Sequence, residues 1–219
     1  MFGSSSGGRY LVLGAALALF TAGPVRAEDI SEAQILKALS PQPAAAPRTR
    51  SLSIGAPAPA AAPMIAPSAD TAFVDTLRNK PSRALSLGER EKLGSVAASK
   101  PQIDLPMEFD YNSDVLRGDA LKNADNLGRA LTSAQMRGQT FMIAGHTDAK
   151  GGEAANQRLS ERRAEAVKSH LVQNYGIPAA NLITVGYGKT HLKVNSDPFA
   201  RENRRVQAVN MLQVQTAGR

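Results

Sequence analysis

A short polar stretch between two apolar segments holds the densest set of groups in the chain that could bind a ligand. Residues 145–152 read Gly-His-Thr-Asp-Ala-Lys-Gly-Gly, and the next segment carries Asn156 and Arg163. A glycine-flanked loop that leaves a strand and enters a helix has free backbone N–H groups near the start of that helix, and these suit a ligand carboxylate. If the loop folds back over the helix, Asp148 and Arg163 become opposite charges at the mouth of one cleft. Two interpretations stay open: a ligand site, or a salt bridge that holds the loop to the helix.

Catalytic and metal chemistry fit these residues less well. His146, Asp148 and Ser160 are the residue types of a hydrolase triad, which is defined by geometry rather than by order in the chain. Ser160, however, falls within a helical turn and lacks the sharp strand-to-helix elbow that exposes a nucleophile. A metal site built from His146, Asp148 and His170 or His191 lacks two histidines with ligand spacing on one helix face. The sequence therefore predicts no enzyme, no cofactor and no metal site.

Two further motifs follow this stretch. Gly186-Tyr187-Gly188 resembles part of a dinucleotide-binding loop, but the third glycine and the following helix are missing, so it predicts a tight turn. Asn203-Arg204-Arg205 precedes an apolar strand. This motif either contacts phosphate or caps a sheet edge and forms salt bridges with a helix.

The elements that must position these residues follow from the apolar pattern after residue 101. Apolar residues alternate with polar ones from Ile103 to Phe109, which predicts a strand with one buried face, and Pro106 places it at a sheet edge because proline lacks an N–H. Further strands are predicted at 140–144, 182–185 and 206–214. Helical spacing predicts two helices, one through Ala120, Ala124, Leu127 and Leu131, the other over 156–174 with Ala164, Val167 and Leu171 on its buried face. This order predicts an α/β sandwich in which helices pack on one mixed sheet.

The first hundred residues differ in composition from the rest. The apolar run 10–22 would reach only about 20 Å as a helix, short of a bilayer core of about 30 Å, so residues 1–27 are predicted to be a cleaved signal peptide. A capping-box pattern at Ser31 predicts a short helical segment within 28–40. Residues 41–67 are rich in Pro and Ala and are predicted to be a linker. Residues 68–100 have little apolar periodicity and are predicted to be a poorly defined, partly helical segment.

Composition narrows the possible functions. The 219 residues include no Cys, which excludes disulfides, thiolate metal sites and a lipidated cysteine. The formal net charge is +7, but the basic residues are spread thinly and no segment forms a dense Lys/Arg stripe. The sequence therefore predicts no nucleic-acid partner.

Five motifs together resemble the OmpA-like C-terminal domain family, whose members associate with peptidoglycan. The resemblance covers about residues 101–215 and implies a β/α/β/α/β-β fold that binds the peptide stem of peptidoglycan non-covalently. The motifs occur in the family's order: Phe109-x-x-x-Ser113, Gly145-His-Thr-Asp148-x-x-Gly151, Asn156-x-x-Leu-Ser160-x-x-Arg163-Ala164-x-x-Val167, Gly186-Tyr-Gly188 and Asn203-Arg-Arg-Val206.

The resemblance also implies roles for single residues. Asp148 matches the aspartate that receives the ammonium of meso-diaminopimelate, and Arg163 matches the arginine that clamps its carboxylate. Thr147 and Asn156 match neighbours of that pocket. This assignment suits the chemistry, because arginine presents two parallel N–H groups to a carboxylate. A lysine-type stem lacks that carboxylate and would leave Arg163 without its partner.

The chain departs from well-known relatives in its N-terminal part. It has no lipobox cysteine, and residues 28–100 lack the alternating strands of a transmembrane barrel. We therefore expect a module in the periplasm or cell envelope, either soluble or associated with the outer membrane, with residues 28–100 available to an envelope protein partner. The alternative is an inner-membrane-anchored component that couples the wall to an envelope machine through an uncleaved N-terminal segment.

Overall fold

The computed structural model describes residues 30–41, 69–107, 109–110 and 112–212. The predicted signal peptide, 1–27, and nearly all of the predicted linker, 41–67, lie outside the described residues. None of the helices in the described part of the chain combines the length and apolar character needed to cross a bilayer.

Four strands form one mixed sheet in the order β1-β4-β2-β3. β4 (Arg205–Leu212) pairs antiparallel with both β1 (Gln102–Pro106) and β2 (Thr140–Gly145), whereas β2 pairs parallel with β3 (Leu182–Gly186). β1 is an edge strand, as Pro106 predicted. It ends at Pro106 rather than at Phe109, and this shorter strand leaves Phe109 outside the sheet.

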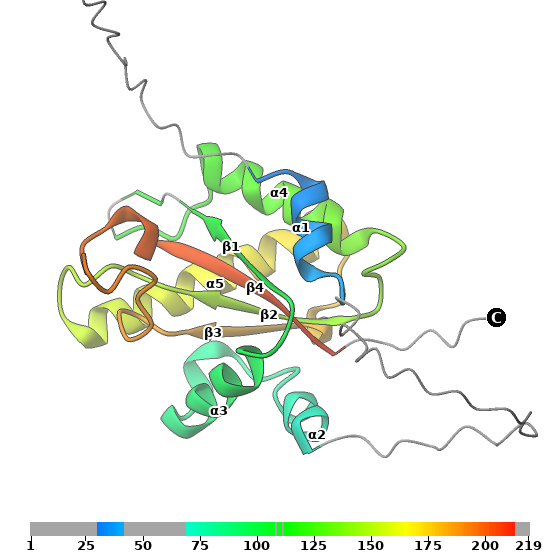
Figure 1. Cartoon of the computed structure of the whole chain (residues 1–219), viewed down its shortest axis with the longest axis horizontal. Coiled ribbons are helices and arrows are strands. Elements are labelled where there is room, and N and C mark those ends of the chain that lie inside the picture. The colour runs from blue at the N-terminus through cyan, green and yellow to red at the C-terminus, as the bar shows by residue number, and fades with distance from the viewer. Residues whose placement is uncertain (1–29, 42–68, 108, 111, 213–219) are drawn as a thin grey trace, which may run out of the picture.

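Three helices cover one face of the sheet. α4 (Gly118–Thr132) and α5 (Glu153–Tyr175) follow β1 and β2, and α1 (Glu32–Leu39) packs beside α4, as Figure 1 shows. The residues that predicted the two longer helices by their spacing are all buried in the core beneath them: Ala120, Ala124, Leu127, Leu131, Ala164, Val167 and Leu171. The periodicity therefore identified the correct helical faces.

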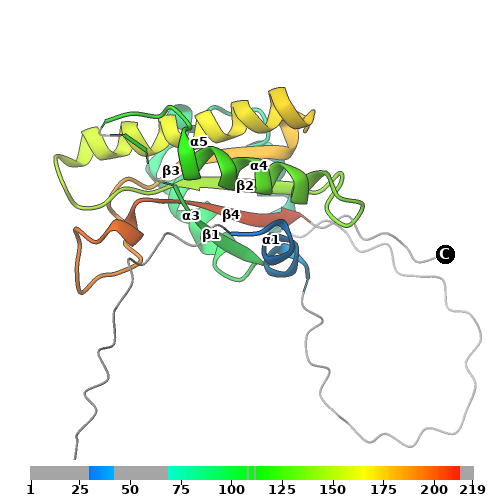
Figure 2. The same ribbon diagram turned by 90° about the horizontal axis from the view of Figure 1, so that it is seen from above.

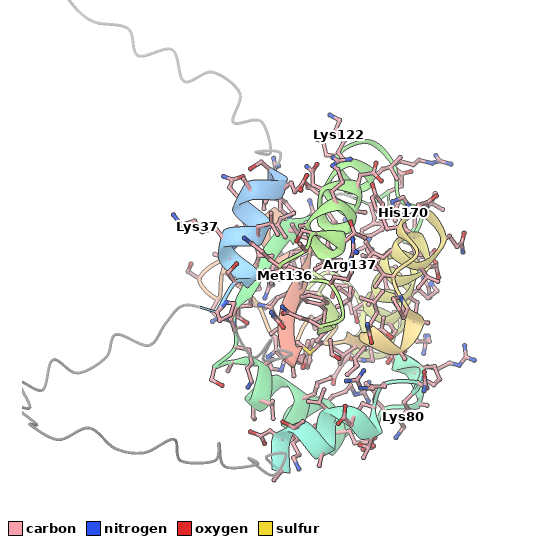
Figure 3. The ribbon with its side chains drawn as sticks, turned by 90° about the vertical axis from the view of Figure 1, so that its right-hand side faces the viewer. Lys37, Lys80, Lys122, Met136, Arg137 and His170 are labelled. Carbon is pink, nitrogen blue, oxygen red and sulfur yellow. The ribbon has the colours of Figure 1, made fainter. Side chains whose placement is uncertain are left out.

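The opposite face of the sheet is covered by the segment that the sequence left poorly defined. Residues 69–100 contain α2 (Ala69–Thr76), the 3-10 turn η1 (Ser82–Ala84) and α3 (Leu87–Ala97). Their apolar side chains, including Leu77 and Leu93, form a second core with Met142 and Ile183 of the sheet. The sheet thus lies between two helical layers: Figure 2 shows α4 and α5 along one side of it, and Figure 3 shows α2 and α3 on the side away from α1 and α4.

Local capping explains where two of these helices begin. The Ser31 hydroxyl accepts a hydrogen bond from the Gln34 N–H, and the Gln34 side chain accepts one from the Ser31 N–H. Ser86 and Glu89 form the same reciprocal pair at the start of α3. The capping box predicted at Ser31 is therefore present, and the fold prediction of helices on one mixed sheet is confirmed. Two more 3-10 turns, η2 (Ala179–Asn181) and η3 (Arg201–Asn203), precede β3 and β4.

Candidate ligand-binding site

A cavity of about 350 Å³ lies where the loop after β2 meets the first turns of α5. All four residues that the sequence singled out line it: Thr147, Asp148, Asn156 and Arg163. The loop that follows β1 closes another side with Phe109. Elements far apart in sequence thus bring the predicted site residues to one opening.

Asp148 does not form the salt bridge with Arg163 that the sequence left open. Its Oδ2 lies 2.9 Å from Nη1 of Arg204, and its Oδ1 accepts a hydrogen bond from the Lys150 N–H at 3.1 Å. The Asp148 side chain is 14% exposed, so it is partly shielded yet still reaches the cavity. A carboxylate has about four lone-pair positions, so this one can accept further donors from a ligand.

The groups that hold the Arg163 side chain in place leave the terminal nitrogens of its guanidinium available to a ligand. Its Nε donates to the Ser113 carbonyl at 3.1 Å, and the guanidinium carbon lies 4.6 Å from the centre of the Phe109 ring. Burial, together with nearby Arg204, lowers the pKa of Arg163 to about 10, while Asp148 opposes this shift. Arg163 therefore stays charged at neutral pH. Within the described residues, its side chain forms a hydrogen bond through Nε alone, and its two terminal nitrogens form none.

Thr147 and Asn156 complete the wall of the cavity between these charges. The backbone N–H of Thr147 donates to Gly188, while its buried hydroxyl has no hydrogen-bond partner among the described residues. The Asn156 amide donates to the Lys150 carbonyl at 2.9 Å, which ties the loop to α5. Thr147 thus offers a free polar atom, and Asn156 fixes the shape of the loop.

Close packing of strand ends on α5 sets the position of this corner. A Cβ atom on Gly145 would lie 2.1 Å from the Ser160 carbonyl oxygen, and one on Gly186 would lie 2.6 Å from the Ser160 hydroxyl. The Ser160 hydroxyl accepts a hydrogen bond from the Gly188 N–H and donates to the Gln157 carbonyl, both at 2.8 Å. Gly186-Tyr187-Gly188 is therefore a turn docked on α5, in agreement with its prediction.

The residue types of a hydrolase triad do not form one. Ser160 is fully buried and uses its hydroxyl in the contacts with Gly188 and Gln157. His146 is also buried and stacks on Tyr187 with 5.4 Å between ring centres, whereas Asp148 bonds to Arg204. No group of three His, Cys, Asp or Glu side chains in the described ranges is placed to hold a metal ion.

Sequence reasoning singled out the Asn203-Arg204-Arg205 motif but missed the part it plays in the site. Arg204 lines the cavity and pairs with Asp148, and Arg205 pairs with Asp104 of β1 at 3.0 Å. Both arginines form salt bridges, as one interpretation of the motif stated, but their partners lie on a loop and a strand rather than on a helix. The sequence motif identifies two adjacent cations. Their salt-bridge partners are determined by the antiparallel pairing of β4 with β1 and β2, which the motif does not reveal.

The structure thus defines a small α/β module with a charged cavity at one end of its sheet. Residues 108–205 match the OmpA family, and this part of the chain is an OmpA-family domain. The family is non-enzymatic and binds peptidoglycan.

Relatives match part of the chain. Outer membrane porin F of Pseudomonas fluorescens is 35% identical over 109 residues, which are 49% of this chain and 32% of that protein. The peptidoglycan-associated lipoprotein of Pseudomonas aeruginosa is 38% identical over 81 residues, which are 37% of this chain and 46% of that protein. The solved structure of the OmpA-like domain of FopA1 from Francisella tularensis has a TM-score of 0.43 at 22% identity, over 49% of this chain and 69% of that one. The chain spans under half the length of the two named proteins.

Proposed function

We propose that this domain binds peptidoglycan non-covalently by holding the meso-diaminopimelate of the peptide stem between Asp148 and Arg163. The single observation that carries the proposal is that both side chains line one cavity of about 350 Å³ without forming a salt bridge with each other. The far end of diaminopimelate carries an ammonium and a carboxylate. Binding it needs one acceptor and one forked donor a short distance apart.

Each side chain has a distinct role in this proposal. The Asp148 carboxylate accepts the ligand ammonium, and Arg204 on its other oxygen holds it in place. The terminal nitrogens of Arg163 donate to the ligand carboxylate, while the bond from Nε to Ser113 fixes the plane of the guanidinium. The unpartnered Thr147 hydroxyl supplies another hydrogen bond.

The charges around the cavity favour an acidic peptide stem. Lys150, Arg163 and Arg204 line it against Asp110 and Asp148, which leaves one excess positive charge. We expect modest affinity for a single stem. The dense repetition of stems in the wall would raise retention by keeping the local ligand concentration high.

A sacculus pull-down with matched variants tests this proposal. Asp148→Asn and Arg163→Gln each remove one charge and should reduce retention at least tenfold, because a charge-assisted hydrogen bond contributes about 1.5–3 kcal/mol. Arg158→Gln removes the same charge from an exposed position on α5 outside the cavity and should bind like the unmodified protein. Titration should show binding of free meso-diaminopimelate and not of lysine. If Asp148→Asn and Arg163→Gln are retained as well as Arg158→Gln and the unmodified protein, the site is refuted.

We also propose that the chain acts in the cell envelope, because the relatives named above include an outer-membrane and a peptidoglycan-associated protein. In this proposal residues 1–27 are an export signal, 41–67 a linker and 101–215 the wall-binding domain. Mass spectrometry of the exported protein should find a mature N-terminus near Glu28. An intact start at Met1 or Phe2 would instead favour the membrane-anchored alternative.

A further inference from the structure

A second cavity, of about 260 Å³, lies between α3 and the sheet, on the side opposite α5. It shares no lining residue with the cavity at Asp148 and Arg163. One of its walls is α3, which precedes the residues matched by the OmpA family. The cavity therefore arises where α3, which lies outside the family match, packs on the sheet.

Two buried side chains that line this cavity have polar atoms without partners. Neither ring nitrogen of His146, which is 2% exposed, has a hydrogen-bond partner of good geometry in the described part of the chain, although the His191 backbone lies close enough to raise the pKa of the ring. Arg205, which is 8% exposed, bonds to Asp104 through Nε and to the His191 carbonyl through Nη2, but its Nη1 is unpartnered. A buried polar group without a partner costs about 1–3 kcal/mol, so both groups favour a ligand that supplies one.

The charges around the cavity favour an anion. Burial, together with the charges of Arg205 and His191, lowers the pKa of His146 to about 3, while Asp104 and the His191 backbone oppose this shift, so the ring is neutral and offers one donor and one acceptor. Arg205 and Lys193 both lie beside Asp104, which compensates only one of these two cations. Burial also lowers the pKa of His191. The free donor of Arg205 is thus the strongest polar group that a ligand could meet.

Most of the remaining lining is apolar or aromatic, and the side-chain amides of Gln102 and Gln207 add polar groups to it. Ala97 at the end of α3 and Ala98 directly after it form one wall, with Met142 from β2 and Leu192 from the loop after β3. The Tyr187 ring lies between His146 and His191, with ring centres 5.4 and 4.4 Å apart. Such a lining suits the uncharged body of a small molecule, whereas a bare inorganic ion would leave it unfilled.

We propose that this cavity binds a small carboxylic acid with an apolar or aromatic body. The carboxylate accepts from Nη1 of Arg205 and from the ring N–H of His146, and the body lies against α3 and Leu192. This site is separate from the proposed peptidoglycan site and would make the domain responsive to a second ligand on its other face.

A titration of the full chain with benzoate, followed by backbone amide NMR at pH 7, tests the proposal. We expect saturable shifts for the cavity-lining residues 94, 97, 98, 146, 187, 191, 192 and 205. Inorganic phosphate should bind at least tenfold more weakly, because it lacks an apolar body. Shifts that do not saturate, shifts confined to the peptidoglycan site, or equal binding of phosphate would overturn the proposal.

Matched variants on α3 separate this site from general effects on the fold. Ala98→Leu places a larger side chain at an exposed position of the lining and should weaken benzoate about tenfold or more. Ser95→Leu makes a similar change at an exposed position of the same helix outside the lining and should leave affinity unchanged. Arg163→Gln should also leave benzoate binding unchanged. Wild-type affinity in Ala98→Leu, or a loss in Arg163→Gln, would place benzoate elsewhere and refute the site.

Discussion

At the scale of single residues, the domain orients Arg163 by surrounding groups rather than by a counter-charge. The Phe109 ring faces the guanidinium and the Ser113 carbonyl accepts from Nε, so two residues of one sequence motif converge on the same side chain. Burial then disfavours the charged form without neutralising it. The geometry explains why Arg163→Lys is not a conservative change here: lysine has neither the flat surface for Phe109 nor two parallel donors.

His146 gives the domain a stability that depends on pH. Its pKa is lowered to about 3 in the folded chain, mainly by burial, from 6.5 in the exposed imidazole. Between these values the unfolded chain binds one more proton than the folded chain, so the free energy of unfolding falls as pH decreases through this window. From pH 6.5 to pH 5 the loss from this residue is about 2 kcal/mol, at about 1.4 kcal/mol per pH unit.

The measurement is urea denaturation at several pH values between 6.5 and 5. His146→Gln should show a shallower dependence on pH than the unmodified protein, by close to one proton. His191, whose pKa is also lowered, leaves a residual slope in both proteins. Identical slopes in the two proteins would mean that His146 takes up a proton in the folded state.

At the scale of elements, glycines set how closely β2 approaches α5. A methyl group on Gly145 would overlap the Ser160 backbone, so Gly145→Ala must push the strand and the helix apart. We expect a loss of stability of about 1–3 kcal/mol or more, as for an overpacked core. We also expect weaker binding to sacculi, because Asp148 follows β2 and Arg163 lies on α5.

Gly88 on α3 provides the control for this substitution. No atom lies within 4 Å of a Cβ built there, and its backbone is helical. Gly88→Ala should therefore be neutral or stabilise the protein by about 0.5–1 kcal/mol. Thermal denaturation distinguishes the two variants, and similar melting temperatures would show that β2 and α5 separate without cost.

Elements with a regular apolar period could be predicted from the sequence, and those without one could not. The spacing of Ala164, Val167 and Leu171 fixes the buried face of α5 without reference to any other part of the chain. The segment before residue 101 buries Val74, Leu85 and Leu93 from short helices and turns, so no period extends across it. The sequence predicted helices there, but their packing depends on a sheet that forms from residues much later in the chain.

The same distinction applies to the candidate site. Asp148 and Arg163 could be selected by residue type and by position around a loop. The partner of Asp148 could not be predicted from the sequence, because Arg204 becomes its neighbour only when β4 aligns between β1 and β2. Whether Asp148 pairs directly with Arg163 therefore depends on the tertiary structure and could not be decided from the sequence.

At the scale of the whole molecule, both described N-terminal segments pack on the domain. Asn210 of β4 donates to the Leu39 carbonyl at the end of α1, and Asn126 of α4 donates to the Ile30 carbonyl at its start. α2 and α3 cover the other face of the sheet. Residues 42–68 thus join two packed helices, and the reach of any N-terminal attachment depends on the residues before Ile30 instead.

This arrangement predicts that the family-matched half of the chain is not an independent stable unit. A fragment that starts at Pro101 exposes the sheet residues Met142, Ile183, Val185 and Met211, each worth about 1.5–3 kcal/mol when fully buried. It should unfold at a much lower denaturant concentration than the unmodified chain and bind a dye that reports exposed apolar surface. A fragment that starts at Ala69 keeps this face covered and loses only the contacts of α1, chiefly Ile35 and Leu39, so it should fall between the two. If the shortest fragment unfolds at the same midpoint as the full chain, α2 and α3 contribute nothing to the stability of the sheet, and the second core is not part of what holds the domain together.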